Sequence, residues 1–466
     1  MDSQRLRSRS KETFTTGYWI VAFLYSDQIS AVAADNKLLA KKSAHMDESV
    51  WTHTRQWAWG FSLVTGLVLY SGTISDKADL QHNPDRDGSG KRGGKCSLVT
   101  DQFNVQQHPY PMCKTPLHPF LAALPKCEHH IHIEGSLEPS LLFSLAKQND
   151  ITLPADDAAF ASTDALLDRY KRFTSLDDFL HYYYIGMSVL VEAADFEALA
   201  WEYFQKAANH GVHHAEVFFD PQAHVVRGIA YSTIMTGFAA ARERARRELG
   251  ISTLLICCFL RHLPVQQSLD LFDHPDVQTS YEDGSVVGIG LDSSELPFPP
   301  KWFQELFSKG EDKNLKLTSH AGEEGPVGYI EDALHVLGVH RIDHGLRLAD
   351  DPILMKRIAD EKILLSLCPL SNVLLRCVDR ISEVPIRKYL DAGVKFSINS
   401  DDPAYFGGNY ILDNYCAVHE EFDLSIAEWE KICRAGIEGS WCLQPRKDEM
   451  LDALQKLVGH WDGYIA

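Results

Sequence analysis

The sequence predicts an α/β fold in which eight parallel strands alternate with helices and close into a (β/α)8 TIM barrel. Between residues 127 and 400, eight short runs of apolar, strand-forming sequence are separated by longer stretches, several with helical periodicity. Eight strand–helix units are the number that closes such a barrel. No Gly-rich phosphate loop follows an early strand of this region, which disfavours an open doubly wound sheet.

Each expected strand is a short apolar run at a regular interval along the chain. In order they are Cys127–Ile133, His214–Phe219, Ser252–Phe259, Ser285–Leu291, Leu315–His320, Arg341–His344, Ile363–Cys368 and Lys395–Ser400. The intervening sequence gives the helices. Residues 195–210 and 232–249 repeat apolar side chains at helical spacing before a glycine, and Pro385 opens a third helix that ends at Gly393.

Composition and charge separate the chain into two parts. The 466 residues are 45% hydrophobic and 23% charged, as in folded globular proteins. Residues 1–110 hold 13 basic and 11 acidic side chains, so residues 111–466 hold the other 32 of 45 basic and 53 of 64 acidic ones. We therefore expect a barrel domain over 111–466 and an unassigned, disordered extension over 1–110.

The extension contains one apolar stretch, Trp57 to Tyr70, within an uncharged segment. It is shorter than the roughly 20 residues that a membrane helix needs, and it begins too late for a signal peptide. Three interpretations stay open: a membrane anchor, a local hydrophobic helix, or sequence that takes no part in the fold. The segment as a whole could be a lineage-specific addition, a targeting sequence or the product of a misassigned gene start.

The net charge of −19 has the wrong sign for a nucleic-acid binder, so no nucleic-acid partner is expected. Ten scattered cysteines, with no C-x-x-C pair, read as reduced thiols of a cytoplasmic protein, with a nuclear location also open. A membrane partner is not expected, and the sequence gives no oligomeric state.

Chemically active side chains gather at the predicted carboxyl ends of the strands, where barrel enzymes place their active sites. His130 and His132 share one face of the first strand, because side chains alternate along a strand. The fifth, sixth and eighth strands end in His320, His344 and Asp401. Imidazole and carboxylate ligands suit Zn²⁺, which activates water. The fourth strand ends without the lysine that often bridges two metals, which favours a single ion.

Five motifs carry a family resemblance. They are LPKCEHHIHIEGS at 124–136, HAGEEG at 320–325, RIDHG at 341–345, CPLSN at 368–372 and NSDDP at 399–403. Together they resemble the adenosine and adenine deaminase family of metal-dependent hydrolases, over about residues 120–459. Within it, the runs HAEVFFDPQ at 214–222 and GLDSSE at 290–295 are most similar to the fungal adenine deaminases.

The resemblance implies one Zn²⁺ per chain and a role for each residue of the motifs. The implied zinc ligands are His130, His132, His320 and Asp401. Glu323 would carry a proton to the purine, His344 would orient the water, and Asp402 would hydrogen-bond a ring nitrogen. The implied reaction is hydrolysis of adenine to hypoxanthine and ammonia, in purine salvage and nitrogen catabolism.

The choice between base and nucleoside depends on two further positions. Glu134 stands where the adenosine-specific branch has an aspartate assigned to the ribose, and we expect the longer side chain to fill the space that a ribose needs. Ser293 is expected near N3 of the base. The alternatives are deamination of adenosine, a noncatalytic zinc-bound binding module, which would be expected to lack Glu323 or His344, and a membrane-tethered receptor-like protein.

Overall fold

The computed structural model describes residues 115–465. The predicted extension over 1–110, with its apolar stretch, lies outside these residues. The division into an extension and a barrel domain stays a prediction.

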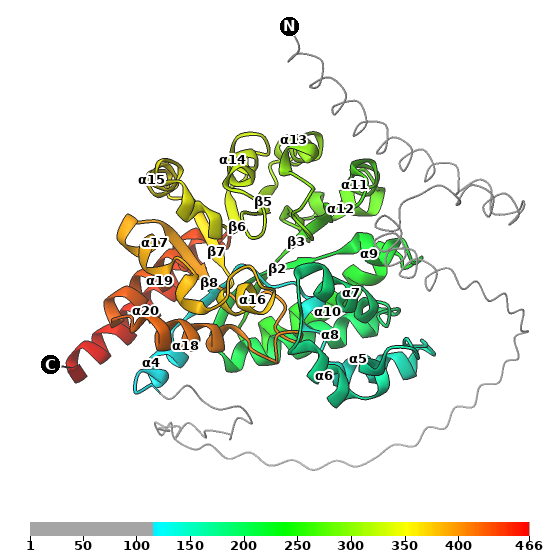
Figure 1. Cartoon of the computed structure of the whole chain (residues 1–466), viewed down its shortest axis with the longest axis horizontal. Coiled ribbons are helices and arrows are strands. Elements are labelled where there is room, and N and C mark those ends of the chain that lie inside the picture. The colour runs from blue at the N-terminus through cyan, green and yellow to red at the C-terminus, as the bar shows by residue number, and fades with distance from the viewer. Residues whose placement is uncertain (1–114, 466) are drawn as a thin grey trace, which may run out of the picture. The chain divides into compact units, whose positions relative to one another are not determined.

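Eight parallel strands form one sheet in which every strand pairs with its neighbours in chain order (Figure 1). They are β1 (Lys126–Glu128), β2 (Val212–Phe219), β3 (Ser252–Leu260), β4 (Gly288–Asp292), β5 (Lys316–Ala321), β6 (Arg341–His344), β7 (Leu364–Leu367) and β8 (Lys395–Ile398). The strands are buried along nearly their whole length, as parallel strands covered by helices are. This confirms the predicted barrel.

The barrel closes through single backbone bridges beyond the ends of β1 and β8. The N–H of Asp401 donates to the carbonyl of His130 at 3.0 Å, and the N–H of His132 donates to the carbonyl of Asp401 at 3.1 Å. The prediction of a continuous strand to Ile133 was therefore wrong, because the regular ladder ends at Glu128. Past that point the backbone alternates between β8 and β2, which brings the two histidines to the barrel mouth.

The expected fourth strand also begins later than predicted. Gly284 has a φ of +75°, and Oδ1 of Asp283 accepts a hydrogen bond from the N–H of Ser285 at 2.7 Å. This turn holds Ser285 out of the ladder, so β4 starts at Gly288.

Helices surround the sheet (Figure 1). They are α4 (His118–Ala123), α5 (Pro139–Gln148), α6 (Thr163–Tyr170), α7 (Leu176–Met187), α8 (Ala193–Asn209), α9 (Pro221–Val225), α10 (Tyr231–Glu248), α11 (Val265–Phe272), α12 (Pro275–Glu282), α13 (Gln304–Asp312), α14 (Val327–His335), α15 (Pro352–Glu361), α16 (Pro369–Leu374), α17 (Ile386–Ala392), α18 (Ile411–Phe422), α19 (Ile426–Gly439) and α20 (Gln444–Ile465). The three helices predicted from periodicity correspond to α8, α10 and α17.

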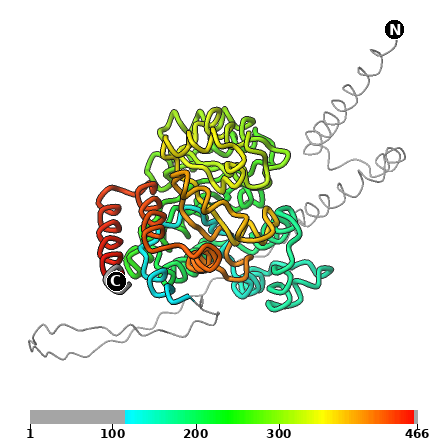
Figure 2. The backbone as a smooth tube through the Cα atoms, turned by 60° about the vertical axis from the view of Figure 1, so that its left-hand side comes forward, coloured from blue at the N-terminus to red at the C-terminus, as the bar shows by residue number. Residues whose placement is uncertain are grey.

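The C-terminal helices cover the seam of the barrel. Helix α19 packs against β8 and β1, and α20 lies beside α19 (Figure 2). Trp429 of α19 is fully buried and stacks on Tyr415 of α18 with ring centroids 5.0 Å apart. This packing ties the last strand to the first, next to the bridges that bring His130 and Asp401 together.

Helix α7 is the element outside the strands that matters most for the site. It begins at Ser175, whose Oγ accepts a hydrogen bond from the N–H of Asp178 at 3.1 Å, and two acidic residues occupy its first turn. At its other end, Arg227 donates to the carbonyls of Met187, Ser188 and Leu190 at 3.0–3.1 Å. Both ends of α7 are thus fixed by side chains.

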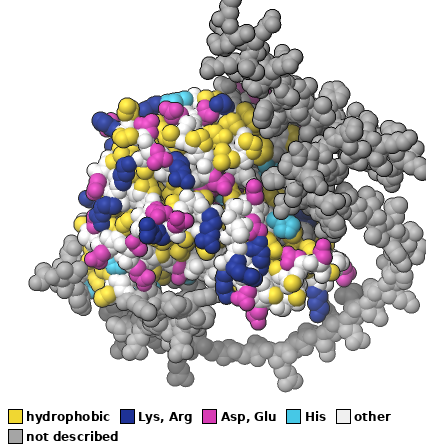
Figure 3. All heavy atoms as spheres, in the orientation of Figure 1, with side chains coloured by type: hydrophobic (Ala, Val, Ile, Leu, Met, Phe, Trp, Pro, Cys, Tyr) yellow, Lys and Arg dark blue, Asp and Glu magenta, His cyan; other side chains and the backbone are white. Residues whose placement is uncertain are grey.

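The face seen in Figure 3 carries basic and acidic side chains interspersed with one another. Among residues 115–465, no helix combines the length and apolar composition needed to span a membrane. Seven cysteines in the same range are free thiols: Cys127, Cys257, Cys258, Cys368, Cys377, Cys433 and Cys442.

Candidate active site at the carboxyl ends of the strands

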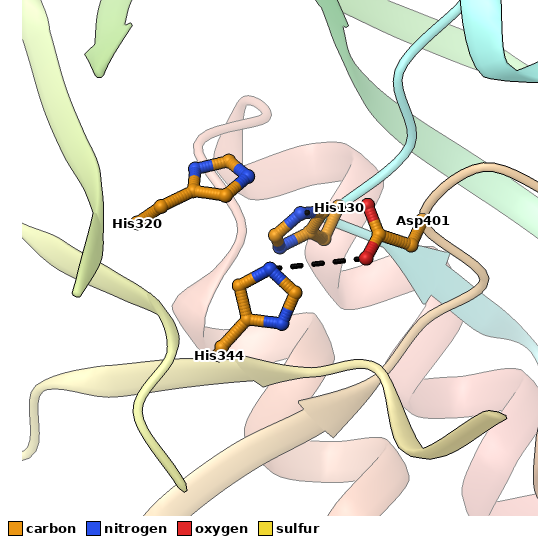
Figure 4. Close-up of side chains that lie close together, drawn as sticks. All are labelled: His130, His320, His344 and Asp401. Carbon is orange, nitrogen blue, oxygen red and sulfur yellow. Dashed lines mark ion pairs between the residues drawn. The ribbon is translucent and has the colours of Figure 1, made fainter. Parts of the chain in front are cut away.

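Four buried side chains from four strand ends point toward one another (Figure 4). One ligand atom from each of His130, His320, His344 and Asp401 lies within 4.8 Å of the others. Nε2 of His130 is 3.2 Å from Oδ1 of Asp401. Imidazole and carboxylate groups arranged in this way could hold a divalent metal ion such as zinc.

His132 reaches the same place from the other side. Its Nε2 lies 3.2 Å from Nε2 of His320 and 3.6 Å from Oδ1 of Asp401. The structure therefore brings together the four residues predicted to bind metal and adds His344 to the cluster. Burial lowers the pKa of His132 and His320, which favours the neutral imidazole that a metal needs.

Hydrogen bonds behind the cluster determine which nitrogen of His130 is available. Oγ of Ser366 donates to Oδ1 of Asp343 at 2.8 Å, and Nδ1 of His130 lies 3.0 Å from the same Oγ. Since the hydroxyl proton is committed to Asp343, Nδ1 of His130 is the donor and Nε2 carries the lone pair. Nε2 is buried without a hydrogen-bond partner and faces the cluster, as a metal ligand would.

His344 has the opposite arrangement. Nδ2 of Asn372 lies 3.2 Å from Nδ1 of His344, and an amide nitrogen can only donate. Nδ1 is therefore the acceptor, and the proton is on Nε2. That proton points toward Oε2 of Glu323 at 3.5 Å and Oδ2 of Asp401 at 3.8 Å. Burial, followed by the nearby His130, lowers the pKa of His344 to about 3. His344 thus presents a donor rather than a lone pair.

Glu323 lies beside the cluster on the loop after β5. Its Oε1 accepts a hydrogen bond from Nδ2 of Asn372 at 3.2 Å, and its backbone N–H donates to Oε1 of Glu295 at 3.2 Å. Burial and the carboxylate of Asp401 raise the pKa of Glu323 well above its ordinary value. A carboxyl group in such surroundings favours its protonated form, as a proton donor must.

Asp402 follows the cluster and is 4% exposed, with no hydrogen-bond partner for Oδ1. Burial and Asp401 raise the pKa of Asp402. A Cβ at position 135 would lie 2.0 Å from Oδ1 of Asp402, so only glycine fits there. Ser293, His344 and Asp401 have positive φ angles of 71°, 62° and 67°. Such left-handed residues cost conformational energy and are typical of functional sites.

These groups line one cavity at the barrel mouth, with a volume of about 390 Å³ that includes its open side. Its polar lining includes His132, His320, Glu323 and the two aspartates after β8. Its apolar lining comes largely from α7 and consists of Leu176, Phe179, Leu180, Leu260 and Leu375. A cavity that combines apolar side chains with a few polar groups suits a small heteroaromatic ring.

The two remaining predicted positions are placed differently. Ser293 lines the cavity, and its Oγ lies 2.7 Å from Nδ1 of His262 and 3.2 Å from the hydroxyl of Tyr184. Glu134 is fully buried but does not line the cavity. Its Oε1 accepts from the N–H of Asp220 at 3.2 Å and lies 3.0 Å from Nε2 of His224. A role for either residue in substrate binding stays a prediction.

Two aspartates in the cavity were missed from the sequence. Asp220 follows β2 and Asp292 ends β4, so the rule that strand ends carry the chemistry applied to both. Oδ2 of Asp292 lies 3.5 Å from Nδ1 of His132, and burial, followed by Asp220, raises the pKa of Asp292. Asn372 was quoted only as part of a motif, although it contacts both Glu323 and His344.

Comparison with known proteins agrees with this geometry. The family model described as adenosine deaminase matches residues 125–457. The chain belongs to the adenosine deaminase family. An adenine deaminase of Schizosaccharomyces pombe is 54% identical over 354 residues, which cover 76% of this chain and 96% of the relative.

Solved structures of family members have the same architecture. The crystal structure of adenine deaminase from Arthrobacter aurescens has a TM-score of 0.68 and 40% identity, and the match covers 72% of this chain and 99% of that one. An amidohydrolase from Burkholderia ambifaria, determined with bound zinc, has a TM-score of 0.67 and 27% identity, with 76% and 97% covered. Amidohydrolases of this kind depend on a metal ion, and the His/Asp cluster at the carboxyl ends of the strands is a group of side chains that could hold one.

Proposed function

We propose that this chain hydrolyses adenine to hypoxanthine and ammonia. The observation that carries the proposal is that Glu323, His344 and the His/Asp cluster meet at one cavity that is also lined by apolar side chains. A proton carrier, a donor for water and a group of side chains that could hold a metal ion thus lie at the same cavity. The high identity to an adenine deaminase over nearly its whole length supports the same reaction.

The proposed metal is one Zn²⁺ per chain, bound by His130, His132, His320 and Asp401. The lone pair on Nε2 of His130, which has no partner within the protein, supports this choice of ligands. His344 is left out of the set because its Nε2 carries the proton. A zinc ion in this position would supply Lewis acidity, which lowers the pKa of water toward neutrality.

The side chains around the cavity would supply the other groups that the reaction needs. C6 of adenine is a poor electrophile until N1 accepts a proton, and Glu323 is the carboxyl group placed to give it. The N–H on Nε2 of His344 would hold the attacking oxygen. Asp402 would hydrogen-bond a second ring nitrogen. As the C6–O bond forms and the C6–N bond breaks, the exocyclic nitrogen leaves as ammonia, and the ring becomes hypoxanthine.

The test is a comparison of kcat/KM for adenine, adenosine and cytosine, measured as ammonia release by the purified full-length protein. The proposal expects adenine to be the preferred substrate and hypoxanthine to be its product. A preference for adenosine would replace it with nucleoside deamination. Absence of ammonia release from all three, by protein that contains metal, would support a noncatalytic binding module instead.

We expect a cytoplasmic enzyme of purine salvage and nitrogen catabolism, with the nucleus as the other compartment to examine. The seven free thiols named above support a reducing compartment. Fractionation of the tagged full-length chain tests it, because recovery only in the membrane pellet would contradict it.

A further inference from the structure

Asp220 is a buried acceptor in the cavity that the proposed reaction does not use. It lies at the end of β2, lines the cavity and is 1% exposed. Its Oδ2 accepts a hydrogen bond from the hydroxyl of Tyr183 at 3.0 Å, while Oδ1 has no hydrogen-bond partner. Buried polar atoms are rarely left unpaired in folded proteins. An unpaired oxygen in a binding cavity therefore indicates a missing donor from a ligand.

The neighbouring carboxyl group of Asp292 also has one buried oxygen, Oδ1, without a hydrogen-bond partner, but its other oxygen faces the metal cluster. Asp220 and Asp292 each place an oxygen within 4.8 Å of a nitrogen of His132. Oδ2 of Asp292 faces Nδ1 of His132 at 3.5 Å, which makes Asp292 the partner that orients a metal ligand. Asp220 is held by Tyr183 instead, so it is the acceptor that remains available to a substrate.

The orientation of the purine decides which of its atoms Asp220 would meet, and this step rests on the proposed function. With C6 at the metal cluster and N1 at Glu323, the N7 edge faces Asp402. The far edge of the ring, which carries N3 and N9, is then directed away from the cluster. Free adenine carries a proton on N9, whereas a nucleoside carries the sugar there. The free base alone offers a donor at this edge.

We propose that Oδ1 of Asp220 accepts the N9–H of adenine and thereby selects the free base over N9-substituted purines. A substituent at N9 would remove the donor and leave a buried carboxylate oxygen unpaired. Sites that hydrogen-bond a substrate N–H reject analogues lacking it by about 10⁴-fold, far more than a shape mismatch of one methyl group does. Asp220 would therefore set the choice between base and nucleoside.

Glu134 acts through Asp220 in this account and is a positioning residue. Its Oε1 accepts from the backbone N–H of Asp220, and His224 reinforces that contact. A guanidinium nitrogen of Arg227 lies 2.8 Å from Nδ1 of His224, which leaves Nε2 of His224 to donate to Glu134. The same Arg227 holds the end of α7. Glu134 thus fixes the backbone that presents Asp220, without lining the cavity itself.

The test compares kcat/KM for adenine and 9-methyladenine in the wild type, Asp220→Ala and Asp220→Asn. The wild type should prefer adenine by about 10⁴-fold, and Asp220→Ala should reduce that preference by about 100-fold or more. Asp220→Asn keeps the size of the side chain, but its amide can turn a donor toward N9. The kcat/KM for adenine should therefore fall more than the kcat/KM for 9-methyladenine. An unchanged ratio in both folded, metal-containing variants would overturn the proposal.

A control variant and the activity of the wild type distinguish failure of this proposal from failure of the proposed function. Asp177→Asn removes a carboxylate that bonds Ser294 and does not line the cavity, so the ratio should stay at the wild-type value. A wild type that does not deaminate adenine would refute the proposed function rather than the role of Asp220.

The positioning role of Glu134 has its own test on the same ratio. Glu134→Gln keeps an oxygen acceptor for the N–H of Asp220 and should retain most of the preference for adenine. Glu134→Ala should lose it in the same way as Asp220→Ala. Glu134→Asp restores the residue of the nucleoside branch but leaves Asp220 in place, so adenosine should stay a poor substrate. Efficient deamination of adenosine by Glu134→Asp would contradict the assignment and support direct exclusion of ribose by Glu134.

Discussion

The barrel contains two buried polar clusters that differ in whether their carboxylate and imidazole groups are paired within the protein. Near the amino end of β6, Nη1 of Arg341 donates to Oε2 of Glu216 at 2.5 Å, and the guanidinium lies 4.0 Å from the ring centre of Trp441. Both oxygens of Glu216 have partners within the protein. At the carboxyl ends, His130, Asp220 and Asp402 each keep a buried atom unpaired. Glu216 thus has protein partners for both oxygens, although Nε and Nη2 of Arg341 are buried without hydrogen bonds, whereas the carboxyl-end cluster keeps acceptor atoms that ligands could use.

Two buried glutamates, one in each cluster, have pKa values that are shifted in opposite directions. Burial alone would raise the pKa of Glu216, but Arg341 and His214 hold it well below its ordinary value. Glu323 is equally buried and has no cation beside it, so burial and Asp401 raise its pKa. A glutamate paired with arginine is a structural anion, whereas a glutamate among carboxylates can store a proton. Four substitutions test this contrast.

Glu323→Gln should have the largest effect on the carboxyl-end cluster. It keeps the shape and removes the ionisable proton donor, so kcat should fall by about 10²–10⁴-fold while bound zinc is retained. Glu324→Gln is the matched control, since Glu324 is the adjacent carboxylate and does not line the cavity. Steady-state kinetics and metal analysis of both variants check this. Loss of metal from Glu323→Gln would show that Glu323 acts as a ligand instead.

Arg341→Met should damage stability rather than chemistry. It leaves Glu216 buried without its cation, which should lower the free energy of unfolding by about 3–5 kcal/mol. The double variant Glu216→Gln with Arg341→Met removes both charges and should recover much of that loss. Denaturant unfolding of the three proteins measures it. A stable Arg341→Met protein with reduced kcat would contradict the structural role of this pair.

Ser366→Ala should weaken metal binding without removing a ligand. It deletes the acceptor that orients Nδ1 of His130, and the loss of such a partner lowers metal affinity by about 10–100-fold. Ser397→Ala is a matched control, because Oγ of Ser397 lies 3.0 Å from Nδ1 of His129, which is outside the cluster. Competition with a zinc chelator compares the variants. Equal affinities would show that Ser366 does not support the site.

The pH dependence of stability tests Lys126, at the amino end of β1. Its Nζ donates to the carbonyls of Leu121, Ala122 and Leu124, and burial lowers its pKa to about 7. Between about pH 7 and 10.4, the unfolded chain binds the additional proton, so this lysine makes stability rise with pH by at most about 1.4 kcal/mol per unit. Lys126→Met should flatten that rise in unfolding measurements. Equal slopes in both proteins would refute it.

The residues at the strand ends could be predicted from the sequence, because a local sequence pattern marks each strand and the barrel fold determines where the strand ends lie. An apolar run ending in His or Asp marks a barrel strand, and parallel strands bring those ends together. That combination predicts His320, His344 and Asp401 in one cluster, where the structure has them. The same rule covered Asp220, yet a single carboxylate before a proline gives no sign that one of its oxygens lacks a partner.

Other features depend on contacts between distant residues and leave no local signal. Helix α7 supplies much of the apolar lining of the cavity although it follows no strand directly, and its amphipathic pattern is that of any surface helix. The contact between Glu134 and Asp220 joins residues 86 positions apart. The resemblance identified Glu134 as important, and the expectation that it fills the ribose space came from its length. Its burial behind Asp220 suggests the indirect role proposed above.

The central claim is that His130, His132, His320 and Asp401 hold one metal ion that is needed to deaminate adenine. The most direct test is to remove metal from the full-length protein, add zinc back stepwise, and measure bound zinc and ammonia release from adenine in the same samples. The account predicts no activity without metal and a linear rise that stops at one zinc per chain. Activity in metal-free protein, or a rise that continues to two ions, would contradict it.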